Sequence, residues 1–180
     1  MSDAWIQAIG GKKISLDNPN WKDFDIKNIA NSLSRLCRFG GDLRDGIEIY
    51  SVAQHSVLVS QQVEKKYALC GLLHDASEAI CVDLPSPIKA RFPAYKEMES
   101  IFYLAIAKRF DIQNPEPIEV KEADIRMLLT EKRDLLPLTL EQWEYEKNFK
   151  PYEHFKIDDC WLPSRASKEF LKRFYELGGK

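Results

Sequence analysis

The segment from Tyr67 to Val82 places the strongest constraint on the fold. It is rich in Ala and Leu, and its apolar residues leave little room for a solvated face: Ala68, Leu69, Leu72, Leu73, Ala76 and Ile80. We therefore predict a central helix that is buried on most sides. Pro85 and Pro87 end it, because each lacks an amide donor and restricts the residue before it. Other helices are needed to cover such an element.

Apolar residues at helical spacing predict further helices on both sides of this segment. One starts at Ile26, with Asp25 as its cap, and another at Ser51-Val-Ala-Gln54, which has the S-x-x-Q form of a capping box. Later helices are expected over residues 93–110, 118–136 and 164–177. Strand signals are weak, and Met1–Asp25 is predicted to be an ordered but irregular arm. Residues 1–180 are thus predicted to form one all-α domain, a single compact helical bundle.

Charge and cysteine content narrow the class of protein. The 26 Lys and Arg against 28 Asp and Glu leave a formal net charge of −2, which gives no overall attraction to a nucleic-acid polymer or an anionic membrane. The four cysteines form no CxxC pair, which is typical of free thiols in a reducing compartment. No stretch approaches the ~20 apolar residues of a membrane span. We expect a cytoplasmic protein, in a host cell if the chain is phage-encoded.

Ionisable residues inside apolar helical patterns are the main functional signal. The chain has three histidines; His55 and His74 lie in such patterns, and Asp75 follows His74 at once. Asp124 interrupts the apolar pattern of a later helix, and Glu78 shares the helical surface of Asp75. Burying a carboxylate without a partner is expensive, and a divalent cation resolves that cost. Two interpretations stay open here: a metal site of two His and two Asp, or residues that simply bond to the backbone, cap helices or pair with arginines.

A longer string around these residues resembles a known enzyme family. The H…HD…D pattern is that of HD-domain phosphohydrolases, and the string His74-Asp-Ala-Ser-Glu78-Ala-Ile-Cys-Val-Asp83-Leu-Pro-Ser-Pro-Ile-Lys89 resembles the H-D-A-x-E-x(4)-D-[LI]-P-[ST]-P-[ILV]-K segment of YfbR-type bacterial 5′-deoxynucleotidases. It is also similar to small phage HD hydrolases, including DatZ-type dATP triphosphohydrolases. Upstream, Cys37-Arg-Phe-Gly-Gly41 and Tyr50-Ser-Val-Ala-Gln-His55 resemble the R-[WF]…VAEHS portion of the same group. The resemblance covers about Trp5 to Leu136.

This resemblance implies a role for each matching residue. The metal ligands are His55, His74, Asp75 and Asp124, around one divalent ion that is Co, Mn, Zn, Mg, Ni or Fe. Glu78 and Asp75 are the catalytic residues, with Glu78 handling protons near the attacking water. The substrate-binding residues are Arg38 and Lys89 for phosphate, and Phe39 and Asp83 for the nucleoside. The implied substrate is a 5′-deoxynucleotide, as a monophosphate or a triphosphate such as dATP, cleaved at the α-phosphate. Relatives of this kind imply a homo-oligomer, a dimer or a hexamer.

Two departures and one alternative accompany this interpretation. Position 54 is Gln where many relatives have Glu, and position 42 is Asp where many have His after the two glycines. Gln at position 54 is expected to affect only a helix cap or a hydrogen bond outside the ligand set. Asp at position 42 puts substrate or second-metal contacts near the loop after the two glycines in doubt. The alternative function is a non-catalytic, nucleotide-binding HD regulator, against which the intact Glu78 argues.

The remaining chemistry-bearing residues receive structural assignments. The run Glu131-Lys-Arg-Asp134 is typical of a solvated helix face. His154 is expected to be packed or exposed rather than a ligand. Trp143 and Trp161 are assigned to packing.

Overall fold

The computed structural model describes residues 4–8 and 10–180 and is mostly helical. The helices are α1 (Ile26–Leu33), α2 (Val52–Gln61), α3 (Ala68–Leu73), α4 (Glu78–Cys81), α5 (Ser86–Lys89), α6 (Pro93–Arg109), α7 (Ile118–Leu135) and α8 (Pro163–Glu176). Short 3-10 helices are η1 (Trp21–Asp23), η2 (Arg38–Gly41), η3 (Lys65–Tyr67) and η4 (Glu144–Lys147), and the strands are β1 (Trp5–Gln7) and β2 (Lys13–Ser15).

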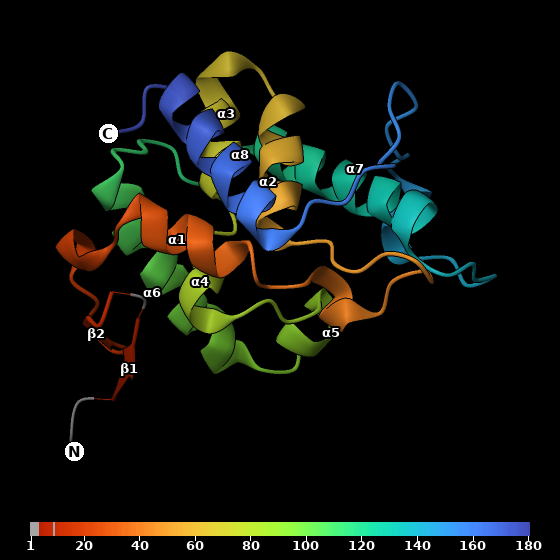
Figure 1. The fold of residues 1–180 in the computed structure, drawn as a ribbon. Coiled ribbons are helices and arrows are strands. Elements are labelled where there is room, and N and C mark those ends of the chain that lie inside the picture. Colours follow the sequence, from red (N-terminus) through yellow and green to blue (C-terminus); the bar gives the residue numbers. More distant parts are fainter. Residues whose placement is uncertain (1–3, 9) are drawn as a thin grey trace.

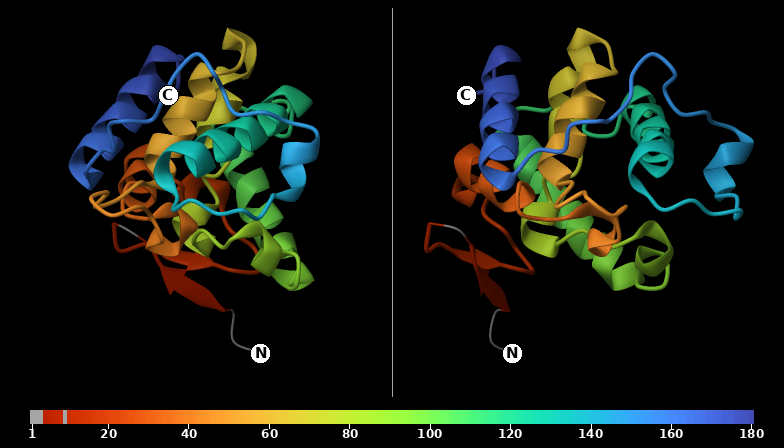
Figure 2. Two further views of the ribbon diagram at one scale, coloured as in Figure 1. Left: turned by 90° about the vertical axis from the view of Figure 1, so that its right-hand side faces the viewer. Right: turned by 45° about the vertical axis from the view of Figure 1, so that its right-hand side comes forward.

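Helix α2 is the centre of the arrangement. It packs against α3, α7 and α8, while α1 lies across α8 (Figure 1). One apolar cluster fills the space between α1, α2, α3, α6 and α8, with Phe102, Phe170 and Phe174 fully buried. A second cluster joins α2 and α3 to α7 and includes Tyr50 and Met127. Between α7 and α8 the chain runs out from the helices in a long segment that carries η4 (Figure 2).

Local sequence explains where the first two of these helices begin. The Asp25 carboxylate accepts hydrogen bonds from the backbone N–H groups of Lys27 (2.9 Å) and Asn28 (3.3 Å), as predicted for the cap of α1. Ser51 Oγ accepts from Gln54 N at 3.2 Å, which confirms half of the predicted capping box. The other half is wrong, because the Gln54 side chain instead binds the backbone at 159 and 161, at 2.7 Å each. The Gln54 side chain thus attaches the segment that leads into α8 to helix α2.

A close approach of α2 to α3 depends on Gly71. A Cβ atom at this position would lie 3.2 Å from Ser60 Cα, which is tighter than about nine in ten real contacts of such an atom. The small residue therefore allows the two helix backbones to come together, and with them the residues that follow α3.

The predicted central helix is interrupted. Helix α3 ends at Leu73, residues 74–77 form turns, and α4 begins only at Glu78. The hydrogen-bond ladder tightens at this point, since Ala76 N bonds to Leu73 O (3.0 Å) and Glu78 N to Asp75 O (3.0 Å). The single helical surface predicted for residues 74 to 78 is therefore wrong, and this stretch is a turn between two short helices.

The N-terminal arm is more regular than predicted. Strands β1 and β2 pair antiparallel, with Ile6 opposite Ile14, so a small sheet accompanies the helices. Gly10 and Gly11 lie at the turn with φ of 88° and 75°. The prediction for residues 1–3 and 9 lies outside the described residues. The longer helices predicted near the C-terminal half are confirmed as α6, α7 and α8.

Two sequence predictions about chemistry are also answered by the fold. All four cysteines, Cys37, Cys70, Cys81 and Cys160, are free thiols. Among the described residues, every helix is too short or too polar to cross a bilayer.

Candidate metal centre

Four side chains from three elements converge beside α2. His55 comes from the first turn of α2, His74 and Asp75 from the turn after α3, and Asp124 from the second turn of α7. His55 Nε2 lies 3.3 Å from His74 Nε2, 3.1 Å from Asp124 Oδ1 and 3.5 Å from Asp75 Oδ2. His74 Nε2 lies 3.2 Å from Asp75 Oδ2 and 3.7 Å from Asp124 Oδ1.

These separations fit the donor set of one metal ion. Nitrogen and oxygen ligands at bond lengths of about 2.1 Å stand roughly 3.0 Å apart at right angles and roughly 3.4 Å apart in a tetrahedron. One ring nitrogen of His55, one ring nitrogen of His74 and a carboxylate oxygen of Asp124 all lie within 4.8 Å of one another. Two imidazoles with two carboxylates are a normal ligand set for divalent transition metals. The residues present therefore fit a metal ion.

The cluster is buried at one end and open at the other. The His55 side chain is fully buried, whereas those of His74, Asp75 and Asp124 are 12%, 20% and 37% exposed. Solvent and a small ligand thus reach the cluster from the side of the two carboxylates.

Both imidazoles are oriented through their other ring nitrogen. His74 Nδ1 lies 2.8 Å from the carbonyl oxygen of Gly71, and His55 Nδ1 lies 2.5 Å from Glu131 Oε1. A ring that donates from Nδ1 leaves the Nε2 lone pair for a ligand, and these are the nitrogens that face the cluster.

Glu131 is the residue that sequence reasoning missed. Its carboxylate is fully buried: Oε1 also accepts from Tyr50 Oη at 2.8 Å, and Oε2 accepts from Arg38 Nε at 3.2 Å. The assignment of this run to a solvated face is thus wrong for Glu131 and for Asp134, which is also buried, whereas Arg133 is exposed as predicted. A usable signal was present, because Glu131 follows Asp124 by two helical turns on the same face of α7.

Charge pairing shifts the pKa values of the groups in the cluster. Burial raises the pKa of Asp75 and of Asp124, but the adjacent imidazoles outweigh it and lower both below the usual range. Burial also works against a charge on His74, yet Asp75 and Asp124 raise its pKa well above the ordinary value. Without a metal, the imidazoles and carboxylates of the cluster therefore interact strongly with one another.

Arg38 joins this cluster to its outer carboxylate. Its guanidinium lies 3.5 Å from Asp75 Oδ2 and 3.2 Å from Glu131 Oε2, and the residue is buried. Burial opposes the charge, but the carboxylates of Glu131 and Asp75 raise the pKa of Arg38 above its usual value. Arg38, which is predicted to bind phosphate, thus lies beside the cluster and is paired with both Asp75 and Glu131.

Glu78 and Lys89 form a second group of charges. Lys89 Nζ lies 3.0 Å from Glu78 Oε1 and 2.7 Å from Glu99 Oε1, which sequence reasoning did not identify. Glu78 Oε2 is buried and has no hydrogen-bond partner among the described residues. Burial, together with the charges of Asp75 and Asp83, raises the pKa of Glu78 well above its usual value. Lys89, predicted to meet phosphate, is thus already held between two carboxylates.

The two predicted nucleoside-binding residues differ in their surroundings. Phe39 is half-buried, with its ring centroid 6.5 Å from that of Trp143. Asp83 is half-buried and makes no hydrogen bond or ion pair within the described part of the chain; burial raises its pKa against the opposing charge of Arg38. It directly follows Val82, whose φ of 64° and ψ of 162° are a rare conformation for a β-branched residue.

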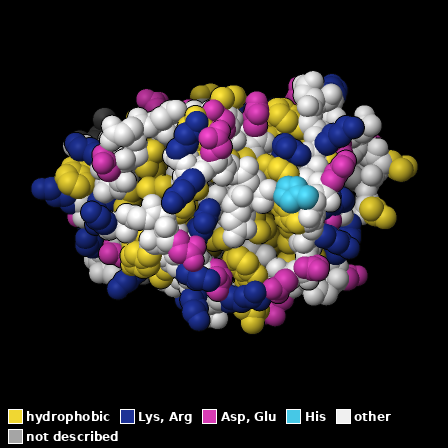
Figure 3. Space-filling model, turned by 90° about the horizontal axis from the view of Figure 1, so that it is seen from above, with side chains coloured by type: hydrophobic (Ala, Val, Ile, Leu, Met, Phe, Trp, Pro, Cys, Tyr) yellow, Lys and Arg dark blue, Asp and Glu magenta, His cyan; other side chains and the backbone are white. Residues whose placement is uncertain are grey.

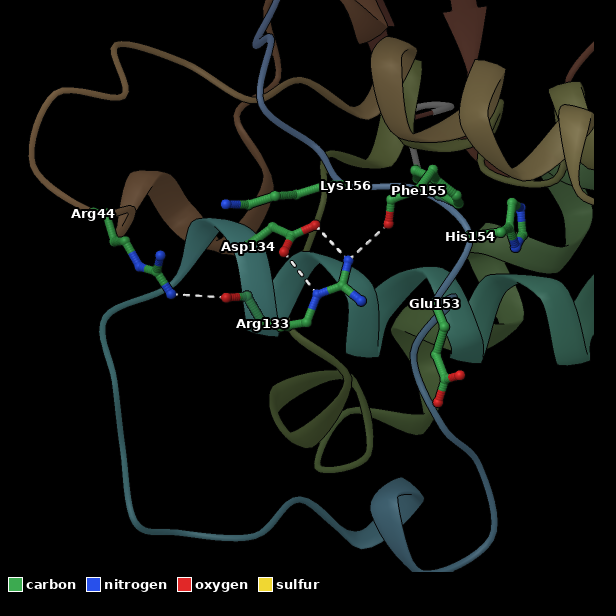
Figure 4. A pocket seen from close by; sticks show the side chains of 7 residues that line it. All are labelled: Arg44, Arg133, Asp134, Glu153, His154, Phe155 and Lys156. Atoms are coloured by element: carbon green, nitrogen blue, oxygen red, sulfur yellow. Dashed lines mark hydrogen bonds and ion pairs between the residues drawn. The ribbon is translucent and has the colours of Figure 1, made fainter.

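Two hollows of the surface lie away from the cluster. One of about 550 Å³ is lined by Arg44, Arg133, His154 and neighbours at the end of α7, where Arg133 is tied to Asp134 and to the Phe155 carbonyl (Figure 4). Another of about 640 Å³ includes Trp21 and Leu104. Neither contains a residue of the His and Asp cluster. His154 packs on Tyr152 and Phe155 and, as expected, is no member of that cluster.

Surface charge does not define a separate basic face in the view from above. Figure 3 shows Lys and Arg side chains interspersed with Asp and Glu rather than gathered into one patch. With a formal net charge of −2, binding of an anionic ligand would depend on locally placed groups such as Arg38.

Comparison with known proteins places the chain among bacterial relatives. No family model matches it. The uncharacterized protein YfdR of Escherichia coli (strain K12) is 38% identical over 174 residues, which is 97% of this chain and 96% of the relative. The uncharacterized protein RCAP_rcc00048 of Rhodobacter capsulatus is 31% identical over 131 residues, 68% of this chain and 66% of the relative. The near-complete match to the first of these shows that the chain belongs to the family of YfdR.

Proposed function

We propose that the protein is a metal-dependent phosphohydrolase that cleaves 5′-deoxynucleotides at the α-phosphate. The observation that carries the proposal is the convergence of two imidazoles, whose Nε2 atoms lie 3.3 Å apart and 3.1 to 3.7 Å from the carboxylate oxygens of Asp75 and Asp124. His55, His74, Asp75 and Asp124 would hold the divalent ion. When bound, such an ion lowers the pKa of a water molecule and polarises a phosphoryl oxygen.

Glu78 is the group that would move the proton. A carboxyl group acts as a general acid or base near neutral pH only if its pKa is raised, and burial beside Asp75 and Asp83 does this to Glu78. Its Oε2 atom has no partner among the described residues, so one oxygen remains for a water or a leaving group. Lys89 holds the other oxygen and so fixes the direction of the carboxyl group.

Arg38 and Asp83 would position the substrate. Arg38 presents a planar guanidinium next to Asp75, where a phosphate on the metal would lie within its reach. Asp83 is half-buried and not engaged in a hydrogen bond within the described residues, so its oxygens are available to a sugar hydroxyl. In this arrangement Lys89 acts chiefly on Glu78, and two of the three N–H donors of its ammonium group are taken by Glu78 and Glu99, so only the third is left for a phosphate.

The experiment is a product assay on metal-stripped protein resupplied with Co²⁺, Mn²⁺ or Mg²⁺. Mono- and triphosphates of all four deoxynucleosides are compared, because inorganic phosphate, pyrophosphate and triphosphate each identify a different cleavage point. We expect turnover that Asp75→Ala abolishes and Glu78→Ala slows while metal content is kept. Glu122→Ala, which removes an exposed carboxylate from the same helix as Asp124, is the control and should behave as wild type.

The outcomes separate the two candidate functions. Absence of turnover on the full panel would refute the enzymatic proposal. Nucleotide binding without turnover would instead favour a non-catalytic regulator.

A further inference from the structure

Two aromatic rings from distant parts of the chain face each other near the candidate metal centre. Phe39 belongs to η2, and Trp143 precedes η4 in the long segment between α7 and α8. Their centroids are 6.5 Å apart and their planes are tilted by 44°, so the rings form an open wedge rather than a stacked pair. Both side chains are only half-buried, so neither is part of the apolar core.

The backbone at Phe39 is held in an unfavourable conformation. Phe39 has a φ of 58° and a ψ of 21°, and it is followed by Gly40 and Gly41, which also have positive φ. Glycine adopts this region freely, but a bulky residue does not. A side chain kept in place against such a preference at the edge of a candidate site points to a role for the ring.

Trp143 is fixed from the opposite side. Its backbone N–H donates to Glu146 Oε2 at 2.5 Å, and Glu146 in turn pairs with Lys132 of α7 at 2.9 Å. Lys132 Nζ also lies 5.0 Å from the Trp143 ring centroid and donates to the carbonyl oxygen of Glu141 at 3.1 Å. The projecting segment is thus fastened to α7 where it carries Trp143.

Arg38 links the wedge to the metal centre. Its guanidinium carbon lies 5.4 Å from the Phe39 ring centroid, and its Nη1 lies 3.5 Å from Asp75 Oδ2. A ligand whose phosphate meets Arg38 and the cluster therefore has the ring of Phe39 directly beside it.

We propose that Trp143 is a specificity-determining residue that forms, opposite Phe39, the second wall of a slot for the planar base of a nucleotide. Two rings in contact with the faces of one base stand about 7 Å apart, and the present separation of 6.5 Å needs only a small opening and a rotation of Trp143. Stacking tolerates every base, so the slot selects for a nucleobase rather than for one kind of base. This inference rests on the proposed function and adds a recognition residue to it.

The test measures binding rather than turnover. Calorimetric titrations of metal-loaded protein use a non-hydrolysable phosphonate analogue of dAMP and, as a base-free probe, inorganic phosphate. We expect Trp143→Ala to weaken binding of the analogue about 10-fold and to leave phosphate binding unchanged, and Trp143→Phe to recover most of the loss. Tyr145→Ala removes a more exposed ring two residues further along and should have no effect.

Each other outcome overturns the inference. Unchanged affinity of Trp143→Ala for the analogue, an equal loss for analogue and phosphate, or no binding of the analogue by wild type would all contradict it. The binding result is independent of hydrolysis. If the protein binds the analogue through Trp143 but cleaves no nucleotide, the proposed reaction is refuted and the base slot stands. If the protein cleaves nucleotides but binds the analogue equally well without Trp143, the base slot is refuted and the proposed reaction stands.

Discussion

Replacing Glu131 by Gln tests how the buried carboxylate supports the metal centre. In the native protein one oxygen serves Tyr50 and His55 and the other serves Arg38. The amide of Gln keeps one acceptor oxygen but turns an NH₂ group toward either the guanidinium or the imidazole. At least one donor then loses its partner, and the buried charge of Arg38 is left with Asp75 alone.

The expected size of the effect follows from these contacts. Breaking a buried ion pair from one side costs about 3 to 5 kcal/mol, and because Arg38 keeps Asp75 we expect about 3 kcal/mol for Glu131→Gln. In a domain of this size that loss lowers the melting temperature of metal-free protein by about 6 to 12 °C. Loss of the partner that orients His55 should also weaken metal binding about 10- to 100-fold.

The assay combines thermal denaturation of the metal-free protein with competition against a chromophoric chelator for Co²⁺. Tyr50→Phe is the matched control, because it removes one hydrogen bond to the same oxygen and leaves the His55 contact intact. It should cost about 1 kcal/mol of stability and change metal affinity little. Glu131→Gln with wild-type affinity for cobalt and reduced stability would show that Glu131 serves only Arg38, and the account of His55 would be wrong.

Three further predictions concern other parts of the structure. Gly40→Ala should lower the free energy of unfolding by about 1 kcal/mol, because Gly40 has a φ of 64°. The cost is conformational, since nothing lies within 4 Å of the added carbon. A change near zero in urea denaturation would refute this. Lys89→Met removes the cation between two glutamates and should cost about 2 kcal/mol, while Met at the exposed Lys96 should cost almost nothing; equal melting temperatures would contradict it. Burial works against the charge of Asp134, but its bonds to Arg133 and a backbone N–H lower its pKa from 3.8, so its contribution to stability is present above that pH and is lost as the pH falls. Asp134→Asn should therefore be less stable than wild type at pH 7, and urea unfolding at lower pH should show the gap closing; a constant gap would refute the assignment.

The helices that are predicted correctly from sequence are those in which apolar residues keep a helical spacing over many residues and whose ends carry clear capping or proline signals. Pro93 and Pro163 lie in the first turns of α6 and α8, where a missing amide donor does no harm. The interruption after Leu73 is not predictable from composition, because Ala and Leu before it and Ala76, Glu78 and Ala79 after it favour a continuous helix. The hairpin is not predicted from sequence because strands of three residues are too short for an alternating pattern to stand out.

The candidate site divides in a similar way. His55, His74, Asp75 and Asp124 stand out in sequence because polar groups rarely interrupt apolar patterns, and the structure brings them together. Glu131 did not stand out, because it opens a run of charged residues that looks solvated. The partner that Lys89 finds in Glu99 depends on the packing of α5 against α6, which no spacing in the sequence encodes.

The most direct measurement is the anomalous diffraction of a crystal soaked with manganese. We predict one strong peak about 2.0 to 2.3 Å from His55 Nε2, His74 Nε2 and an oxygen of Asp124. Diffraction that shows no peak among these side chains, or manganese bound only at another place, would contradict it.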